Sequence, residues 1–263
     1  MQMSDSHTER FDRIRVPAAY EMVADAIEAE IVSGRLRPGD EIGTEAALVR
    51  QFGVNRSTVR EGIRVLEQGG LVRREASRKL FVCEPRASAL TNRMSRALVL
   101  QDVTFRELYE AALILEVGAV ERAVALADGE ALAAMEANQA RLEAVLDNPV
   151  AVAEIDAEFH ALLAHATGNR VLELAREPAA RLFFPTSEMI CRQVPEGATR
   201  MAGAHRHIIA AIRARDAEQA RTWMRRHLDD WRKGFVRTGR DMDAPVERIF
   251  ARYALGRTSS AWE

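Results

Sequence analysis

Four side chains in the second half of the chain have the residue types and the spacing of a divalent-metal site. Asp156 and His160 are four residues apart, so they share one face if this segment is a helix. His205 and His227 lie on either side of a predicted helix break at 215–216, about ten residues before it and about eleven after it. At ~1.5 Å per residue, each lies ~15–17 Å from the turn, so an antiparallel helix pair would bring the two histidines level.

Three imidazoles and one carboxylate suit Zn²⁺, Ni²⁺, Mn²⁺ or Fe²⁺, and they leave coordination positions open for a further ligand. The alternative is that each histidine is an ordinary surface residue or a hydrogen-bonded core residue, and spacing alone leaves this open. His165 and His207 are out of phase with the ligand faces, so we interpret them as structural or exposed.

A second group of candidate residues, basic and hydroxylic, begins a predicted helix in the first third of the chain. It consists of Arg56, Ser57, Thr58 and Arg60. Arginine can bind guanine O6 and N7 in the DNA major groove, and hydroxyls can bind phosphates or base edges. The segment 50–79 holds eight basic and three acidic residues, a net charge of +5, which leaves −7 on the rest of a chain whose total is −2. A basic patch on an acidic chain indicates a polyanion bound at one place, although a solvated charged face is the alternative.

The pattern over residues 44–68 predicts two short helices around a tight turn, which is a helix-turn-helix. Thr44 and Asn55 are suited to N-cap the two helices, and Gly53 ends the first of them. The second helix has an apolar stripe at spacings of four and three residues: Val59, Ile63 and Leu66. The N-terminal end of the second helix is the part of this motif that enters the major groove.

The flanking segments extend this motif to a winged helix. A helix is predicted over about 18–33, followed by a turn at GRLRPGDEI. After two glycines, the runs LVRRE and RKLFVCE predict a two-stranded hairpin with Ser77 near its tip. This wing would lie along phosphates or reach the minor groove through its basic residues, Arg73, Arg74, Arg78 and Lys79.

The remainder of the chain predicts helices only. We expect a disordered tail over 1–15, a linker over 85–103 with a helix over 87–100, and an extension over 240–263. The helical domain between them, 104–239, has six predicted helices, and Pro178 and Pro185 should kink the fourth. Their expected ranges are 104–127, 130–146, 149–167, 169–191, 197–214 and 216–238. The expected fold is therefore mainly α: a winged helix-turn-helix with a small β-hairpin, then an all-α bundle.

Composition favours a helical protein of the cytoplasm. Of 263 residues, 48% are hydrophobic, which provides for a sizeable core, and only 6% are aromatic. Two cysteines, Cys83 and Cys191, do not make a disulfide framework. The polar N-terminus lacks the apolar region of a signal peptide, and no apolar run approaches the ~20 residues that a membrane span needs.

The segment over about residues 16–84 resembles the GntR family of bacterial transcription regulators. The resemblance lies in GRLRPGDEI, in EAALVRQFGVNRSTVREGIRVLEQGGLV and in the final FV of the wing. It implies that Arg56, Ser57, Thr58 and Arg60 contact DNA. Two features depart from the family pattern: Ala46 stands where an arginine is frequent, and EASRKLF lacks the usual wing glycines.

The segments DAEFHALLAHATGN and HRHIIAAIRARDAEQARTWMRRHL resemble the effector domain of the FadR branch of this family, a domain of the FCD type. The resemblance implies a divalent metal on Asp156, His160, His205 and His227, and a small carboxylate effector that coordinates it. The branch often supplies an arginine in a stretch matching LYEAALILE, where this chain has Ala112. The candidates to replace it are Arg181, Arg192 and Arg213.

We therefore expect a homodimeric DNA-binding regulator, most simply a repressor, that binds an inverted-repeat operator and releases it when an acid binds the metal domain. One alternative is a metal sensor without an organic effector. Another is a helical metallohydrolase using the same four ligands. We expect no enzyme, because Glu154 and Glu158 point away from the face of Asp156 and no other carboxylate has the spacing of a general base.

Overall fold

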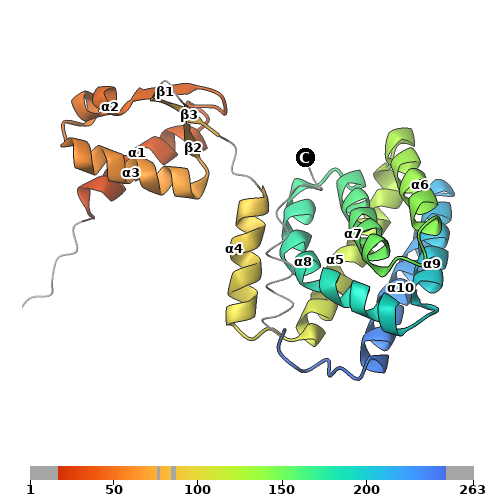
Figure 1. The fold of residues 1–263 in the computed structure, drawn as a ribbon. Helices are drawn as coiled ribbons and strands as arrows, with labels where there is room; N and C mark the ends of the chain where they lie inside the picture. Colours follow the sequence, from red (N-terminus) through yellow and green to blue (C-terminus); the bar gives the residue numbers. More distant parts are fainter. Residues whose placement is uncertain (1–16, 76–77, 84–86, 247–263) are drawn as a thin grey trace, which may run out of the picture. The chain divides into compact units, whose positions relative to one another are not determined.

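The computed structural model describes residues 17–75, 78–83 and 87–246, and its contacts divide the chain into two compact units between Ala89 and Leu90 (Figure 1). The tail expected over 1–15, Ser77 at the wing tip and the end of the extension from residue 247 lie outside the described residues.

The N-terminal unit is a winged helix, as predicted. Its elements are α1 (Ala19–Val32), β1 (Glu41–Thr44), α2 (Glu45–Phe52), α3 (Arg56–Gly69), β2 (Val72–Arg74) and β3 (Lys79–Val82). Thr44 caps α2 by accepting from the Ala47 N–H, and Gly53 ends it with φ +65°. Asn55 caps α3 by accepting from the Thr58 N–H. The local signals at the helix ends thus fix the two central helices.

The wing differs from the prediction in having three strands. The antiparallel sheet has the order β1-β3-β2, and β1 occupies the end of the segment that we predicted to be only a turn. The turn closes at Pro38-Gly39, after which the backbone pairs with β3 from Glu41 opposite Phe81 to Thr44 opposite Lys79. A strand of four residues with an irregular register is too short to show alternation in the sequence.

The helices of the N-terminal unit pack on the sheet around one apolar core. Side chains of α1, α2, α3, β2 and β3 form it: Val23, Ala24, Ile27, Leu48, Val59, Ile63, Leu66, Val72 and Leu80. Gly62 lets α3 approach α1 closely, because a Cβ at this position would lie 2.8 Å from the Tyr20 carbonyl oxygen. This close approach fixes α3 against α1 and leaves the N-terminal end of α3 accessible.

The C-terminal unit is helical, and its six main helices match the predicted ranges to within three residues at each end. They are α5 (Phe105–Leu126), α6 (Gly129–Glu143), α7 (Pro149–Ala166), α8 (Arg170–Gln193), α9 (Gly197–Arg213) and α10 (Ala217–Arg237). α8 contains Pro178 and Pro185 and changes direction along its course, as predicted (Figure 1). The main apolar core lies between α5, α7, α9 and α10.

The predicted linker helix is present as α4 (Ala87–Leu100), but its described side chains, from Leu90 on, belong to the C-terminal unit. Ser95 is buried and donates to the Pro178 carbonyl oxygen at 3.0 Å, and Arg181 donates to the Asn92 side chain at 2.8 Å. The start of the extension packs here too, since Met242 is buried in an apolar cluster with Val99 of α4 and Leu182 of α8. Thus α4 is part of the surface layer of the C-terminal unit.

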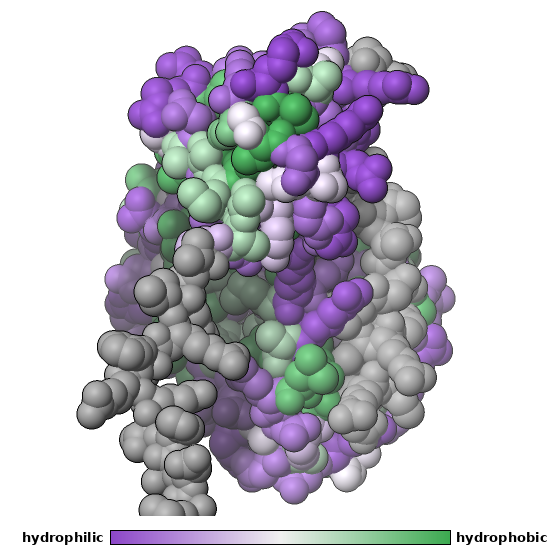
Figure 2. All heavy atoms as spheres, turned by 90° about the vertical axis from the view of Figure 1, so that its left-hand side faces the viewer, coloured by the Kyte–Doolittle hydropathy of each residue, from purple (hydrophilic) through white to green (hydrophobic). Residues whose placement is uncertain are grey.

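Surface chemistry agrees with a chain that buries most of its apolar side chains. Figure 2 shows a face on which hydrophilic residues predominate, with smaller hydrophobic areas between them. In the described part of the chain, no helix combines the length and the apolar character that crossing a membrane requires.

Candidate metal centre and DNA-binding surface

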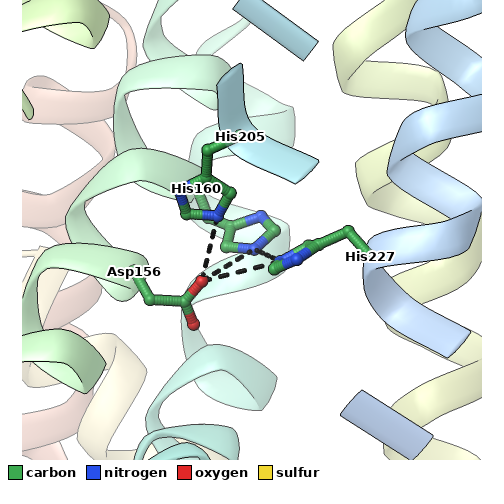
Figure 3. A group of neighbouring side chains, drawn as sticks. All are labelled: Asp156, His160, His205 and His227. Atoms are coloured by element: carbon green, nitrogen blue, oxygen red, sulfur yellow. Dashed lines mark hydrogen bonds and ion pairs between the residues drawn. The ribbon is translucent and has the colours of Figure 1, made fainter. Parts of the chain in front are cut away.

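Three helices bring the four predicted metal ligands together (Figure 3). Asp156 and His160 lie on one face of α7, while His205 comes from α9 and His227 from α10. Their ligand atoms all lie within 4.8 Å of one another, and all four side chains are buried. Asp156 Oδ1 is 3.2 Å from His205 Nε2 and 3.5 Å from His227 Nε2, and His160 Nε2 is 3.0 Å from His227 Nε2. The four ligands therefore converge on one point.

The hydrogen bonding of this cluster fits a cation at its centre. Asp156 Oδ1 and His205 Nε2 form an ion pair at 3.2 Å without a hydrogen bond, and among the described residues neither atom, nor His205 Nδ1, has another hydrogen-bond partner. Unpaired buried polar atoms are costly, and they mark places where an ion or water completes the set. The two facing Nε2 atoms of His160 and His227 can share a proton or bind one metal ion. A divalent cation would satisfy Asp156 Oδ1 together with the Nε2 atoms of the three histidines, whereas His205 Nδ1, on the opposite edge of its ring, would need a different partner.

At three of the four ligands the pKa shift favours the protonation state that a metal needs. His160 is the exception: burial lowers its pKa, but the charge and hydrogen bond of Glu116 outweigh burial and raise it. Burial lowers the pKa of His227 to about 3, with a further contribution from His205, and it lowers the pKa of His205 as well. Burial opposes ionisation of Asp156, but its interactions with the three histidines outweigh this and lower its pKa. Neutral imidazoles and an ionised carboxylate are the forms that bind metal ions.

A second carboxylate, Glu116 on α5, supports the ligand His160. Glu116 Oε2 accepts from His160 Nδ1 at 2.9 Å, which directs the Nε2 lone pair of His160 to the centre of the cluster. Its other oxygen accepts from Arg176 Nε of α8 at 3.0 Å. Although burial opposes ionisation, His160 and Arg176 hold the pKa of Glu116 at about 2. The ring of Phe159 stacks on His205 at 3.8 Å and fixes that ligand from the other side.

Glu116 did not emerge from the sequence as part of the site. The only signal was a single acid within the otherwise apolar run ALILEVGAV, at a position whose helical neighbours are core residues. An acid on a buried helix face requires a partner, and this reasoning would have pointed to a buried cation or histidine.

A cavity of about 90 Å³ opens beside the cluster. Asp156, His160 and His227 line it, so an ion held there would be accessible from the cavity. Its apolar walls include Ala112, Phe183, Phe184 and Trp231, and its polar groups include Arg176 and Arg200. Such a mixture of apolar walls and a few convergent polar groups is typical of a small-ligand site.

The two cavity arginines differ in how their charge is matched. Arg176 is buried between Glu116 and Glu177, to which its Nη1 donates at 3.0 Å. Arg200 of α9 pairs with Glu196 through Nη1 at 3.0 Å and with Asp230 through Nε at 3.5 Å. The contact of Nε with Asp230 is an ion pair without a hydrogen bond, so Arg200 is held less tightly than Arg176.

The N-terminal unit presents the predicted DNA-contacting residues at the start of α3. Arg56, Ser57 and Arg60 are exposed, and Thr58 is half-buried. Ser57 Oγ donates to Asn55 Oδ1 at 2.6 Å, so the helix cap also fixes this hydroxyl. The exposed end of α3 thus carries two arginines on a well-capped helix.

The basic residues of the wing are distributed around the sheet. Arg73 pairs with Glu75 and lies over the Phe81 ring, and Lys79 pairs with Glu41 at 2.7 Å. Arg78 is exposed at the edge of the tip, with a left-handed backbone at φ 60°. Arg74 differs from the others because it turns inward to the helices, where it pairs with Glu45 at 2.8 Å and with Glu67 at 3.3 Å.

Comparison with known families decides the class of protein. Residues 19–82 match the family "Bacterial regulatory proteins, gntR family", and residues 107–230 match the FCD domain. The chain belongs to the GntR family of transcriptional regulators. It has the FadR-like arrangement of a GntR DNA-binding domain followed by an FCD domain, as the sequence predicted.

Individual relatives of this GntR protein span most of its length. The HTH-type transcriptional regulator LutR of Bacillus subtilis is 26% identical over 212 residues, 75% of this chain and 92% of LutR. The HTH-type transcriptional repressor NanR of Salmonella schwarzengrund is 27% identical over 222 residues, 80% of this chain and 81% of NanR. A solved structure, Streptococcus agalactiae GntR, has a TM-score of 0.59 at 22% identity and covers 81% of this chain and 99% of its own. This last likeness shows the fold alone.

The FCD domain places the three predicted effector arginines away from the cavity lining. Arg181 donates to Asn92, Arg192 pairs with Glu188 at 2.7 Å, and Arg213 pairs with Glu136. The arginines that do line the cavity, Arg176 and Arg200, had no distinguishing signal in the sequence. Ala112, where an arginine is frequent in this branch, lines the same cavity.

Proposed function

We propose that this GntR regulator binds an operator whose affinity for the protein is set by a small carboxylate bound at a divalent metal in the FCD domain. The convergence of Asp156, His160, His205 and His227 within 4.8 Å, with unpaired polar atoms facing inward, carries this proposal. The donor set of three imidazoles and one carboxylate favours Zn²⁺, Ni²⁺ or Mn²⁺. A metal in this position would supply an electrophilic centre for an anionic ligand.

The cavity beside the metal ligands supports an acid as the effector. A carboxylate that reaches the metal would lie within a cavity that also contains Arg176 and Arg200. Arg200 is the stronger candidate for a direct contact, because Asp230 pairs with its Nε at 3.5 Å without a hydrogen bond, whereas Arg176 is hydrogen-bonded to two carboxylates. Arg176 would contribute positive potential from the α8 side, although Glu116 and Glu177 already offset its charge. We therefore assign the anion contact to these two arginines instead of Arg181, Arg192 and Arg213.

On the DNA side, we propose that Arg56, Ser57, Thr58 and Arg60 enter the major groove, while Arg73, Arg78 and Lys79 of the wing contact the phosphates. One winged helix offers few contacts, so a homodimer on an inverted-repeat operator would supply the affinity of a specific site. Repression relieved by the acid is our first expectation. The relatives include a repressor, NanR, and the Glc operon transcriptional activator of Escherichia coli, which is 25% identical over 169 residues.

The first experiment is elemental analysis of the purified full chain, beside a His205→Ala, His227→Ala double variant. We expect about one metal ion per chain in the wild type and none in the variant. Gel-shift titrations with a panel of hydroxy acids and sugar acids then test the switch, using operator selected from a random duplex pool. Unchanged operator affinity with a saturating acid whose binding is independently demonstrated would reject the switch.

A metal sensor is the second candidate, and one observation favours it: four protein ligands converge, a number that can complete a tetrahedral Zn²⁺ site without an organic ligand. Operator binding that depends on the metal and does not respond to any acid would support the metal-sensor hypothesis.

Hydrolysis is the weakest candidate. Glu116 is the additional acid near the cluster, and both its oxygens accept bonds from His160 and Arg176, which does not suit a general base.

A further inference from the structure

One acidic side chain in the DNA-binding unit lies between the recognition helix and the wing. Glu45 is the first residue of α2, and it is only 9% exposed. Its Oε1 binds Arg74 Nη1 of β2 at 2.8 Å, and its Oε2 lies 3.8 Å from Arg56 Nε at the start of α3. One buried carboxylate thus faces an arginine from each of the two elements that a winged helix applies to DNA.

The two arginines are held in different ways. Arg74 is bound by Glu45 and also by Glu67 of α3, so it links α2, α3 and the wing. Its side chain is 36% exposed. The side chain of Arg56 is 75% exposed, and only its Nε faces Glu45. The guanidinium of Arg56 is therefore free to reach outward while its inner edge stays near the carboxylate.

We propose that Glu45 is a positioning residue that sets DNA specificity. It keeps Arg74 in the ion pairs that connect the wing to α2 and α3, and it directs Arg56 toward the bases. This inference rests on the DNA-binding role of the winged helix. A long arginine side chain loses rotamer freedom when it is held, and holding it in place before binding reduces the cost of ordering it on DNA. A negative charge beside the DNA surface also weakens binding to phosphates that carry no sequence information. Because phosphate contacts form on operator and random DNA alike, this charge lowers both affinities, and the positioning of Arg56 is what favours the operator.

Glu45→Gln tests the proposal in the full-length protein. The amide retains the shape and can accept one hydrogen bond, but it no longer attracts either arginine as a charge. We expect affinity for the selected operator to fall about tenfold, the scale of losing a positioned charge contact. Affinity for a random duplex should stay equal or rise, and its salt dependence should steepen by about 0.9 in log–log slope as Arg74 becomes available to a phosphate.

Glu41→Gln is the matched control, because Glu41 is also an acid of the wing sheet paired with a base, Lys79, at 2.7 Å. Both substitutions raise the charge of the unit by one. Glu41 is exposed and faces neither Arg56 nor Arg74 in an ion pair. We therefore expect Glu41→Gln to alter the two DNA affinities in parallel, whereas Glu45→Gln should lower the ratio of operator to random affinity.

A double variant separates positioning from simple loss of stability. If Glu45 acts through Arg56, Glu45→Gln with Arg56→Gln should lose little more operator affinity than Arg56→Gln alone. Additive losses, or an equal loss on operator and random duplex, would overturn the proposal. Thermal unfolding of each variant shows whether it remains folded at the assay temperature. Failure of the wild type to bind any selected duplex would instead reject the DNA-binding role itself.

Discussion

The support of His160 by Glu116 makes a prediction that can be worked out from the structure. Glu116 has two oxygens and two partners, His160 Nδ1 at 2.9 Å and Arg176 Nε at 3.0 Å. In Glu116→Gln the amide oxygen can accept from only one of them, and the amide NH₂ then faces the other donor. The substitution must therefore weaken either the orientation of His160 or the pairing of Arg176.

The expected losses follow from those two contacts. Removal of an outer carboxylate from a ligating histidine lowers metal affinity about 10- to 100-fold, which is ~1.4–2.8 kcal/mol. For the metal-free protein, we expect a loss of about 3 kcal/mol in the free energy of unfolding, the lower end for breaking a buried ion pair. The lower end applies because Glu177 remains bound to Arg176 Nη1 at 3.0 Å.

The assay is a competition titration of Zn²⁺ against a chromogenic chelator, together with urea unfolding of the metal-free protein. Glu177→Gln is the control, since it removes a carboxylate from the same arginine without touching His160. We expect it to leave Zn²⁺ affinity near that of the wild type. Equal Zn²⁺ affinity in Glu116→Gln and the wild type would refute the reasoning. An equal loss in both variants would show that Arg176, and not His160, transmits the effect.

Three further outcomes are expected. Gly62→Ala should lower the free energy of unfolding by about 1–3 kcal/mol, because the new methyl group would lie 2.8 Å from the Tyr20 carbonyl oxygen. In the control Gly69→Ala the methyl group meets open space, so the free energy of unfolding should change by less than ~1 kcal/mol. Urea denaturation measures both. Removing the metal with a chelator should lower the Tm by roughly 5–10 °C in calorimetry if the free metal had been at about 100 times its Kd. Arg60→Ala should cost about 1–3 kcal/mol in operator binding and relax the preference at one base pair, which a selection from random duplexes would reveal, while random-duplex affinity changes little.

The helices of the FCD domain could be predicted closely because their ends are set by local chemistry. Asp128, Asn148, Asn169 and Asp216 each cap a helix with a side-chain acceptor, and each was visible in the sequence as a polar break between apolar-periodic segments. The metal ligands were equally accessible. Regular helix geometry predicts that Asp156 and His160 share one face and that the other two histidines lie level with each other. That α7 meets α9 and α10 at this level was expected only from the resemblance to the FadR branch.

The partners around the ligands could not be predicted, because they depend on which helix faces lie together in the folded domain. Glu116 and Arg176 are 60 residues apart and come from different helices, so neither gave a local reason to expect the other. Arg200 looked like any surface arginine until the cavity placed it. Strand β1 failed for another reason: four residues are too few for periodicity, and their pairing with β3 is a tertiary contact.

The division of roles among the helices indicates which element a ligand would move. α7 carries Asp156 and His160 and has its proline only at its first turn, whereas α8 contains Pro178 and Pro185 in its interior. Each proline removes a backbone donor, so the carbonyls of Leu174 and Arg181 lose their usual helical partner. The stretch between the prolines is therefore held less strongly by its own backbone than α7 is.

That same stretch of α8 has two other neighbours. Phe183 and Phe184 face the cavity, and the Pro178 carbonyl and Arg181 hold α4 through Ser95 and Asn92. Along the chain, α4 follows directly after the last strand of the DNA-binding unit, β3. A ligand can shift an equilibrium only by binding one arrangement better than another. An acid that fills the cavity would contact the side chains of α8 directly. We therefore expect the binding of the acid to shift the position of α8 more than that of α7, which carries two of the metal ligands. Because α4 is hydrogen-bonded to α8, a shift of α8 would reach α4.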